Sequence, residues 1–301
     1  MSEHRHDGAA APRVAVRKTH KLYIGGAFPR SESGRSYPVA SADGEHLANA
    51  GMASRKDARD AVAAARKAFP GWAGRTAYNR GQVLYRAAEM MEGRRAQFAA
   101  ELSAATGAGR PEAEREVSAA IDRWVYYAGW TDKAAQVLGG TNPVSGPYDN
   151  RSAPEPTGVV AVLAPQDAPL LGLVSVLAPV VAMGNTAVLV ASERAPLPAV
   201  ALAEVLATSD LPGGVANILT GRTAELAPPL AAHADVNALD LAGALDVAGA
   251  GDLAADLEEA AAETLKRVLR PDPAVEWEAD PGLGRIRPFL ETKTVWHPVG
   301  T

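Results

Sequence analysis

The sequence contains no cysteine among its 301 residues. A cysteine thiolate is strongly nucleophilic and partly ionised near neutral pH, so catalysis through a thiolate is excluded. No Gly-x-Ser-x-Gly turn is present to offer a serine nucleophile instead. The six histidines are dispersed, and no two lie at the spacing of metal ligands on one helix. We therefore expect no catalytic residue and no metal site.

A strong charge of one sign is missing as well. Lys and Arg number 30 against 35 Asp and Glu, which gives a net charge of −5. Nucleic-acid binding usually requires a clustered basic face, so no such partner is expected. The longest apolar run, residues 170–184, is too short to span a membrane and contains Pro179. The first residues show no apolar signal core, so the cytoplasm is the expected compartment.

The first half of the chain has a helical pattern. Residues 1–18 are polar and aperiodic, and we predict a disordered tail there. A domain over residues 19–270 follows, and its first part reads as a β-hairpin near residues 20–40. Apolar residues then recur at helical spacing, which predicts three helices over residues 57–72, 78–103 and 111–137. Asp57 is the expected cap of the first of these helices.

From Gly158 onward, continuous apolar runs alternate with helix-length segments. This alternation predicts an α/β fold with right-handed βαβ crossovers and a doubly wound, mostly parallel, Rossmann-like sheet. We expect strands over residues 159–163, 186–190, 215–219 and 236–241, and helices over residues 170–183, 196–208, 224–232 and 253–269. A Pro- and Asp-rich linker is expected over residues 271–288, followed by a last strand within residues 289–301.

Several short motifs follow one another in an order that resembles the NAD(P)-dependent aldehyde dehydrogenase family. They are EPTGVV at 155–160, PQDAPLL at 165–171, GNT at 184–186, ERAPL at 193–197 and LPGGVAN at 211–217. The resemblance implies a cofactor-binding domain of that family over residues 19–270. It also implies a small β oligomerisation sheet, built from the hairpin near residues 20–40, the segment near 130–152 and the last strand.

Functional positions of the family carry other residues in this chain. Asp167 stands where the family has an asparagine that donates to the oxyanion, and loss of such a donor costs about 3 kcal/mol of transition-state stabilisation. Val190 replaces a lysine that binds the ribose hydroxyls. Glu193, Gly213 and Gly243 match family positions, so they are the candidate, vestigial cofactor-binding residues. Alternatively, Glu193 is a solvated loop carboxylate and Gly243 an ordinary turn glycine.

The resemblance breaks off after the turn at Gly243. Ala244 replaces the family's phosphate-binding serine, and Asp246 adds a carboxylate where the resemblance places an anion. The family continues with a general-base glutamate and a catalytic domain that carries its cysteine. Only about 45 residues separate Gly243 from Phe289, too few for another α/β domain. The chain thus resembles the degenerate second copy of tandem aldehyde dehydrogenases of the family 16 type.

These observations favour a non-catalytic aldehyde dehydrogenase-like subunit, a pseudoenzyme. It would assemble with itself or with a full-length, active aldehyde dehydrogenase and stabilise or regulate that partner, with no cofactor of its own. The alternative is an NAD(P)-dependent oxidoreductase of the same family with residual cofactor binding. A dinucleotide-sensing module without turnover and an inert remnant also stay open.

Overall fold

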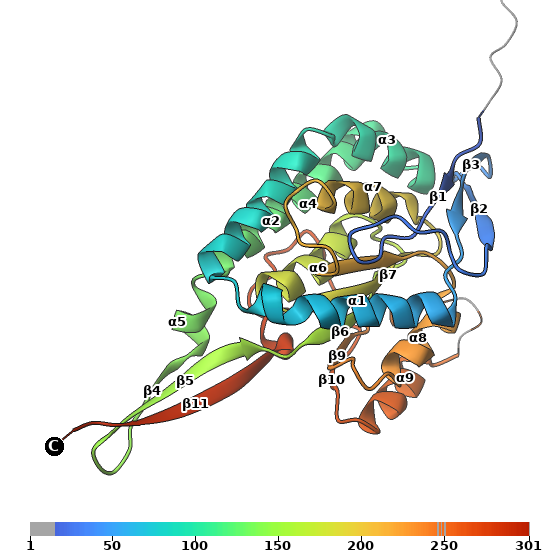
Figure 1. The fold of residues 1–301 in the computed structure, drawn as a ribbon. Helices are drawn as coiled ribbons and strands as arrows, with labels where there is room; N and C mark the ends of the chain where they lie inside the picture. The colour runs from blue at the N-terminus through green and yellow to red at the C-terminus, as the bar shows by residue number, and fades with distance from the viewer. Residues whose placement is uncertain (1–15, 246, 248, 250, 301) are drawn as a thin grey trace, which may run out of the picture.

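The structure is a computed structural model that describes residues 16–245, 247, 249 and 251–300. The tail predicted over residues 1–18 lies mostly outside the described residues. Figure 1 shows a central sheet with helices on both faces, a small sheet at one side, and an arm of β-strands that projects away from the body.

The central sheet has five parallel strands in the order β10-β9-β6-β7-β8. Every residue of β6 and β7 is buried, which explains why their sequences are continuous apolar runs rather than alternating ones. The predicted α/β fold with a doubly wound parallel sheet is confirmed. The strands are β6 (Val159–Leu163), β7 (Thr186–Val190), β8 (Ala216–Leu219), β9 (Ala238–Asp240) and β10 (Arg267–Leu269).

Helices cover both faces of this sheet, and alternate residues of β6 point to opposite faces. Val160 and Val162 belong to a core formed with α2 (Ala77–Glu92), α4 (Arg110–Trp130) and α6. Val159 and Leu163 belong to a second core formed with α1 (Arg55–Ala73), α8 and α9. All residues of α6 are buried, because it lies between the sheet and α4. The crossover helices are α6 (Leu171–Ala182), α7 (Leu197–Leu206), α8 (Thr223–Ala231) and α9 (Leu253–Ala262).

The helices of the first half differ from the predicted ones at their ends. Ser54, not Asp57, caps α1, and Asp57 completes a capping box from the third helical position. The single helix predicted over residues 78–103 is wrong, because α2 ends at the C-cap Gly93 and α3 begins after it. These helices are α1 (Arg55–Ala73), α2 (Ala77–Glu92), α3 (Arg95–Thr106), α4 (Arg110–Trp130) and α5 (Ala134–Leu138).

The hairpin expected near residues 20–40 is formed by other segments. β2 (Ser36–Ala40) pairs antiparallel with β3 (His46–Gly51), and β1 (Thr19–His20) runs parallel to β3. The chain after β1 turns instead toward β8, where Tyr23 and Ile218 exchange backbone hydrogen bonds of 2.9 and 2.8 Å. Within one chain the first strands therefore form a sheet of their own, separate from the arm.

The arm is a three-stranded antiparallel sheet in the order β11-β5-β4. β5 (Tyr148–Pro156) and β11 (Leu290–Pro298) pair along their whole length, with Leu290 opposite Pro156 and Pro298 opposite Tyr148. The short β4 (Gly140–Asn142) completes it. The strand predicted at the end of the sequence is confirmed, and of the segment near 130–152 only the part from Gly140 onward is in the arm.

Residues 271–289, expected as a linker up to residue 288, fold back onto the body and are called the closing segment below. Ile286 and Phe289 are fully buried in the core beneath α4 and α6. The helix predicted to reach residue 269 is wrong, because α9 stops at Ala262 and β10 follows it after a turn at Leu265 with φ of 55°. The closing segment is therefore part of the folded unit.

We predict that Phe289→Ala lowers the free energy of unfolding by about 3–5 kcal/mol, because it leaves a cavity in a closely packed core. The control is Val137→Ala, whose parent side chain is 53% exposed and should contribute less than about 0.5 kcal/mol. Urea titration of both variants measures the effect. Equal stabilities would show that the closing segment does not contribute to the core.

Candidate functional site

The carboxyl ends of the central strands form the edge where α/β sheets bind ligands. The strand order reverses between β6 and β9, and crevices at such a switch point are the usual nucleotide sites. Loops after β6, β7, β8 and β9 meet at this edge. It is therefore the candidate functional site, and the cofactor residues predicted from the sequence are located relative to it.

The side chain of Glu193, in the loop after β7, makes a hydrogen bond and an ion pair within the protein. Its Oε1 accepts a hydrogen bond of 2.5 Å from the backbone N–H of Thr223, the first residue of α8. Its Oε2 lies 3.2 Å from Nη1 of Arg222. The backbone N–H of Glu193 itself donates to Oε1 of Gln166 at 2.9 Å. The carboxylate thus stabilises the N-terminus of α8, and with its side chain 17% exposed it is not a fully solvated loop group.

Gly243 lies at the switch point, but its backbone is pressed against β6. A Cβ atom on Gly243 would fall 2.0 Å from the carbonyl oxygen of Ala164 and 2.8 Å from that of Leu163. The glycine is therefore required by contact between the loops after β6 and β9. The structure gives Gly243 a packing role.

Gly213 is remote from both residues, because it precedes β8 and so lies at the amino end of the strands. A Cβ atom there would fall 2.5 Å from the carbonyl oxygen of Gly25, in the turn after β1. The structure brings Glu193 and Gly243 to the same edge of the sheet and places Gly213 at the other. The cofactor role of these residues stays a prediction, and each has a structural reason for its identity.

A buried ion pair at the same edge was not foreseen from the sequence. Asp240, the last residue of β9, is 1% exposed through its side chain, and its Oδ2 accepts from Nη1 of Arg285 at 2.8 Å. Its Oδ1 accepts from the N–H of Ala242 at 3.1 Å. Burial raises the pKa of Asp240, whereas Arg285 and the Ala242 N–H oppose that shift. The only sequence signal was an acidic residue within a predicted buried strand.

Further contacts hold the closing segment where Arg285 enters the site. The guanidinium of Arg285 stacks on the ring of Trp277, 4.9 Å from its centroid. Arg123 of α4 is buried and donates to the carbonyl oxygens of Trp277 at 2.6 Å and Ala279 at 3.1 Å. The closing segment is thus fixed by two arginines and covers part of the edge.

The N-terminus of α6 is also satisfied by an internal carboxylate. Oε1 of Glu116, on α4, accepts from the N–H groups of Leu170 at 3.2 Å and Leu171 at 3.1 Å. Burial raises the pKa of Glu116, and these two N–H groups oppose the shift. Asp167, just before this helix, is exposed. The N-termini of α6 and α8, two helix ends at this edge, therefore already hold carboxylates.

The residues present at this edge do not fit a dinucleotide. Val190 is 1% exposed and offers no donor. The apolar core between the sheet, α8 and α9 is closely packed and leaves a void of only about 10 Å³. Its lining is apolar throughout: Ala161, Leu163, Ala227, Leu230, Ala231, Leu239, Leu241 and Leu257.

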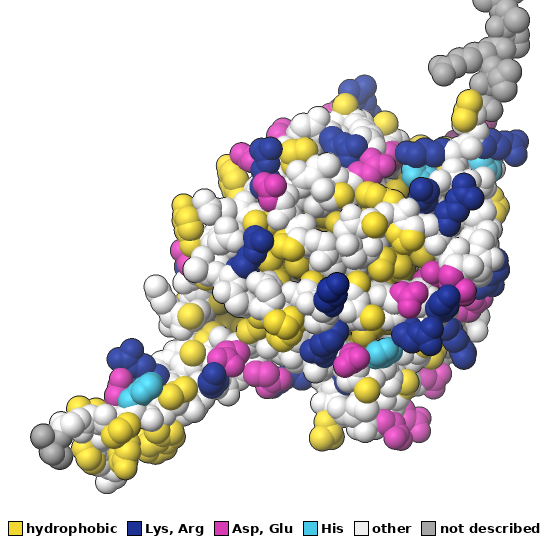
Figure 2. All heavy atoms as spheres, in the orientation of Figure 1, with side chains coloured by type: hydrophobic (Ala, Val, Ile, Leu, Met, Phe, Trp, Pro, Cys, Tyr) yellow, Lys and Arg dark blue, Asp and Glu magenta, His cyan; other side chains and the backbone are white. Residues whose placement is uncertain are grey.

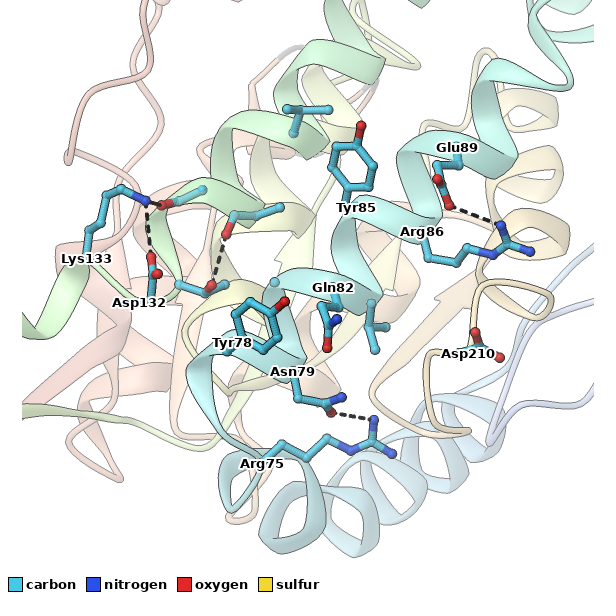
Figure 3. A pocket seen from close by; sticks show the side chains of 16 residues that line it. Arg75, Tyr78, Asn79, Gln82, Tyr85, Arg86, Glu89, Asp132, Lys133 and Asp210 are labelled. Carbon is cyan, nitrogen blue, oxygen red and sulfur yellow. Dashed lines mark hydrogen bonds and ion pairs between the residues drawn. The ribbon is translucent and has the colours of Figure 1, made fainter.

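A broad concavity of about 740 Å³ lies elsewhere, between α2 and the end of α4 (Figure 3). Tyr78, Asn79 and Gln82 of α2 line its centre. Its charged groups are largely paired with their neighbours on the same helix or turn, as in Arg86–Glu89 at 3.0 Å and Lys133–Asp132 at 3.1 Å. The arrangement offers no activated nucleophile or base.

Within residues 16–245, 247, 249 and 251–300, no three His, Asp or Glu side chains come together as a metal site. Nor does any helix in that part of the chain have the length and apolarity needed to cross a membrane.

Comparison with known proteins gives one consistent result. The model of the aldehyde dehydrogenase family matches residues 29–269. A putative aldehyde dehydrogenase, DhaS, of Bacillus subtilis (strain 168) is 34% identical over 256 residues, covering 83% of this chain and 50% of that protein. Cytosolic 10-formyltetrahydrofolate dehydrogenase of Xenopus tropicalis is 33% identical over 238 residues, covering 76% of this chain and 26% of its own length.

Solved structures agree with these matches. An NAD⁺ complex of an aldehyde dehydrogenase from Bacillus cereus superimposes with a TM-score of 0.78 at 28% identity, covering 83% of this chain and 50% of that chain. PnpE from Pseudomonas sp. WBC-3 gives 0.76 at 29% identity with the same coverage. The chain therefore spans between about a quarter and a half of the length of these relatives.

We predict that Asp240→Ala destabilises the protein by about 3–5 kcal/mol, because it leaves the guanidinium of Arg285 without its buried partner. The double variant Asp240→Leu with Arg285→Met removes both charges and should recover most of that loss. Equilibrium unfolding in urea measures both. A single variant as stable as the wild type would contradict the role of this pair in holding the closing segment.

Proposed function

The chain belongs to the aldehyde dehydrogenase family, and from that premise we propose that it acts as a non-catalytic subunit. In this proposal the chain assembles through its arm with a full-length aldehyde dehydrogenase or with a second copy of itself, and stabilises or regulates that assembly. The observation that carries the proposal combines two features. Groups of the protein itself occupy the carboxyl edge of the central sheet, and the arm leaves one edge of β11 unpaired in the described part of the chain.

Chemistry at the edge argues against turnover. The chain has no cysteine to form a thiohemiacetal with an aldehyde. At the oxyanion position, Asp167 is an acceptor when ionised, so it would repel negative charge that develops on the carbonyl oxygen. Glu193 and Arg285 are occupied by contacts within the protein at 2.5 and 2.8 Å. These features support a protein that no longer processes a substrate.

The arm supports a role in assembly. β11 pairs with β5 on one side, and its other edge is unpaired in the described part of the chain, so its backbone groups are available to another strand. Tyr148 is 46% exposed and Trp296 56% exposed, with their rings 5.7 Å apart edge to face. Figure 2 shows hydrophobic side chains gathered at the end of the arm. Exposed aromatic clusters of this kind are typical centres of protein interfaces.

The partner is inferred from the family relationship. A full-length aldehyde dehydrogenase would present a similar arm, and two such arms can pair edge to edge. Assembly in the cytoplasm is part of the proposal.

An alternative function is an NAD(P)-dependent oxidoreductase with residual cofactor binding. It is favoured by one observation, the NAD⁺ complex of the similar enzyme from Bacillus cereus. The contacts that engage Glu193 and Asp240 at the carboxyl edge of the sheet argue against it.

We predict that calorimetric titration of the purified chain with NAD or NADP gives no saturable heat up to roughly 1 mM, the affinity range expected of a working cofactor site. The physical reason is that Glu193 and Gly243 are already engaged in contacts within the protein. A full-length family enzyme titrated in parallel is the positive control. Stoichiometric binding by this chain would instead support the oxidoreductase.

We predict that native mass spectrometry after co-expression with a full-length aldehyde dehydrogenase from the same genome detects mixed or self-assembled particles. Trp296→Asp should weaken them about tenfold or more, because it places a charge in the centre of the interface. The matched control is Leu265→Asp, since Leu265 is 92% exposed and lies off the arm. A wild-type chain that stays monomeric with every partner would refute the proposal.

A further inference from the structure

A second cavity, of about 240 Å³, lies at the far side of the small β1–β3 sheet, away from the arm. One wall is the strand β1 with Lys21 after it, and the other is the turn that leads into β2. Its lining residues are Thr19, His20, Lys21, Arg30, Ser31, Gly34, Arg35, Ser36 and Gly51. Neither wall belongs to the candidate functional site or to the arm.

The charge of this cavity is opposite to that of the protein. The chain carries a net charge of −5, yet the lining contains Lys21, Arg30 and Arg35 and no carboxylate. Burial, reinforced by nearby Lys18, lowers the pKa of His20, so that residue adds little to the positive charge at neutral pH. Figure 2 shows Lys and Arg side chains over this side of the molecule.

Two of these cations have no partner among the residues that the structure describes. The side chains of Lys21 and Arg30 form no hydrogen bond or ion pair with any described residue. Arg35 has a weak pair, with its Nη2 3.7 Å from Oε2 of Glu225, and both side chains are about half exposed. All three side chains are exposed, so water screens their mutual repulsion, and an anion bound between them would be attracted by all three charges.

The frame that holds these cations is rigid, although the side chains themselves reach solvent. Asp57, which is 4% exposed, accepts from Ser31 Oγ at 2.7 Å, from the Glu32 N–H at 3.1 Å and from the Ser54 N–H at 2.8 Å. The turn closes through a hydrogen bond of 2.9 Å from the Gly34 N–H to the Ser31 carbonyl, and Gly34 has φ of 68°, which favours glycine.

The opposite wall is fixed by backbone pairing. Thr19 and His20 pair with β3, and the N–H of Leu22 donates to the carbonyl of Pro29 at 3.1 Å. The N–H of Met52 donates to the carbonyl of Arg35 at 2.9 Å. Both walls are therefore positioned before any ligand arrives, which lowers the entropic cost of binding.

From this geometry we propose that the cavity binds a small phosphate-bearing anion, with Lys21 and Arg30 as its principal ligands and Arg35 as a third. A guanidinium matches the oxygens of a phosphate in a bidentate manner, and a lysine adds a point charge. The volume lies below the usual range for drug-sized ligands, so the ligand is a free phosphate or a small monoester rather than a dinucleotide.

The test is calorimetric titration of the full chain with inorganic phosphate at fixed ionic strength, followed by glycerol phosphate and by acetate. We expect one saturable site for phosphate, with acetate at least tenfold weaker. Tighter binding of glycerol phosphate would identify a monoester as the natural ligand, and tighter binding of phosphate would identify the free ion. Lys21→Gln combined with Arg30→Gln should weaken phosphate binding at least tenfold.

The matched control is Arg115→Gln, since Arg115 is an exposed cation on α4 outside the cavity. It should change the affinity less than twofold, and the melting temperatures of all variants should agree with that of the wild type. The proposal is overturned if phosphate does not saturate below roughly 10 mM. It is equally overturned if acetate binds as well, or if Arg115→Gln weakens binding as much as the double variant. None of these outcomes bears on assembly through the arm.

Discussion

The carboxylate of Asp240 and the guanidinium of Arg285 meet at 2.8 Å inside the edge where a Rossmann-like sheet usually receives its ligand. An isolated charge would be costly there, so each group requires the other. This requirement fixes the closing segment, which Arg123 and the buried Phe289 also hold. From Phe289 the chain enters β11 directly, so the same constraint positions the arm. The contacts that hold the closing segment against the edge therefore also fix where the arm begins.

At this edge, the N-termini of α6 and α8 are hydrogen-bonded to carboxylates of the protein itself. Glu116 caps α6 and Glu193 caps α8, while the backbone of Gly243 contacts that of Ala164. In a dinucleotide-binding protein such helix ends are left for phosphate oxygens. A free phosphate-bearing ligand is instead accommodated, in our proposal, by the cationic cavity beside β1, where the described residues offer positive charge without carboxylates.

Much of the fold could be predicted from the sequence, because β6 and β7 are buried on both faces and their apolar runs are continuous. β10 was missed, because Arg267 is exposed, Val268 and Leu269 are only half-buried, and the segment follows an apparently continuous helix. The family positions Glu193 and Gly243 were also recognised, but their partners were not. Asp240 and Arg285 are 45 residues apart, and Gly213 touches a turn near the start of the chain. Local patterns carry no information on such contacts.

Hydrogen–deuterium exchange over residues 283–289 tests the central claim most directly. The N–H groups of Ile286 and Arg287 donate to the Leu283 carbonyl at 3.1 and 3.2 Å beneath α4, so they should exchange slowly. Our account predicts that this protection is present in the isolated chain, falls in Asp240→Ala, and does not change when millimolar NAD is added. Rapid exchange in the wild type, or a change in protection on adding NAD, would contradict the claim that this segment closes the nucleotide edge.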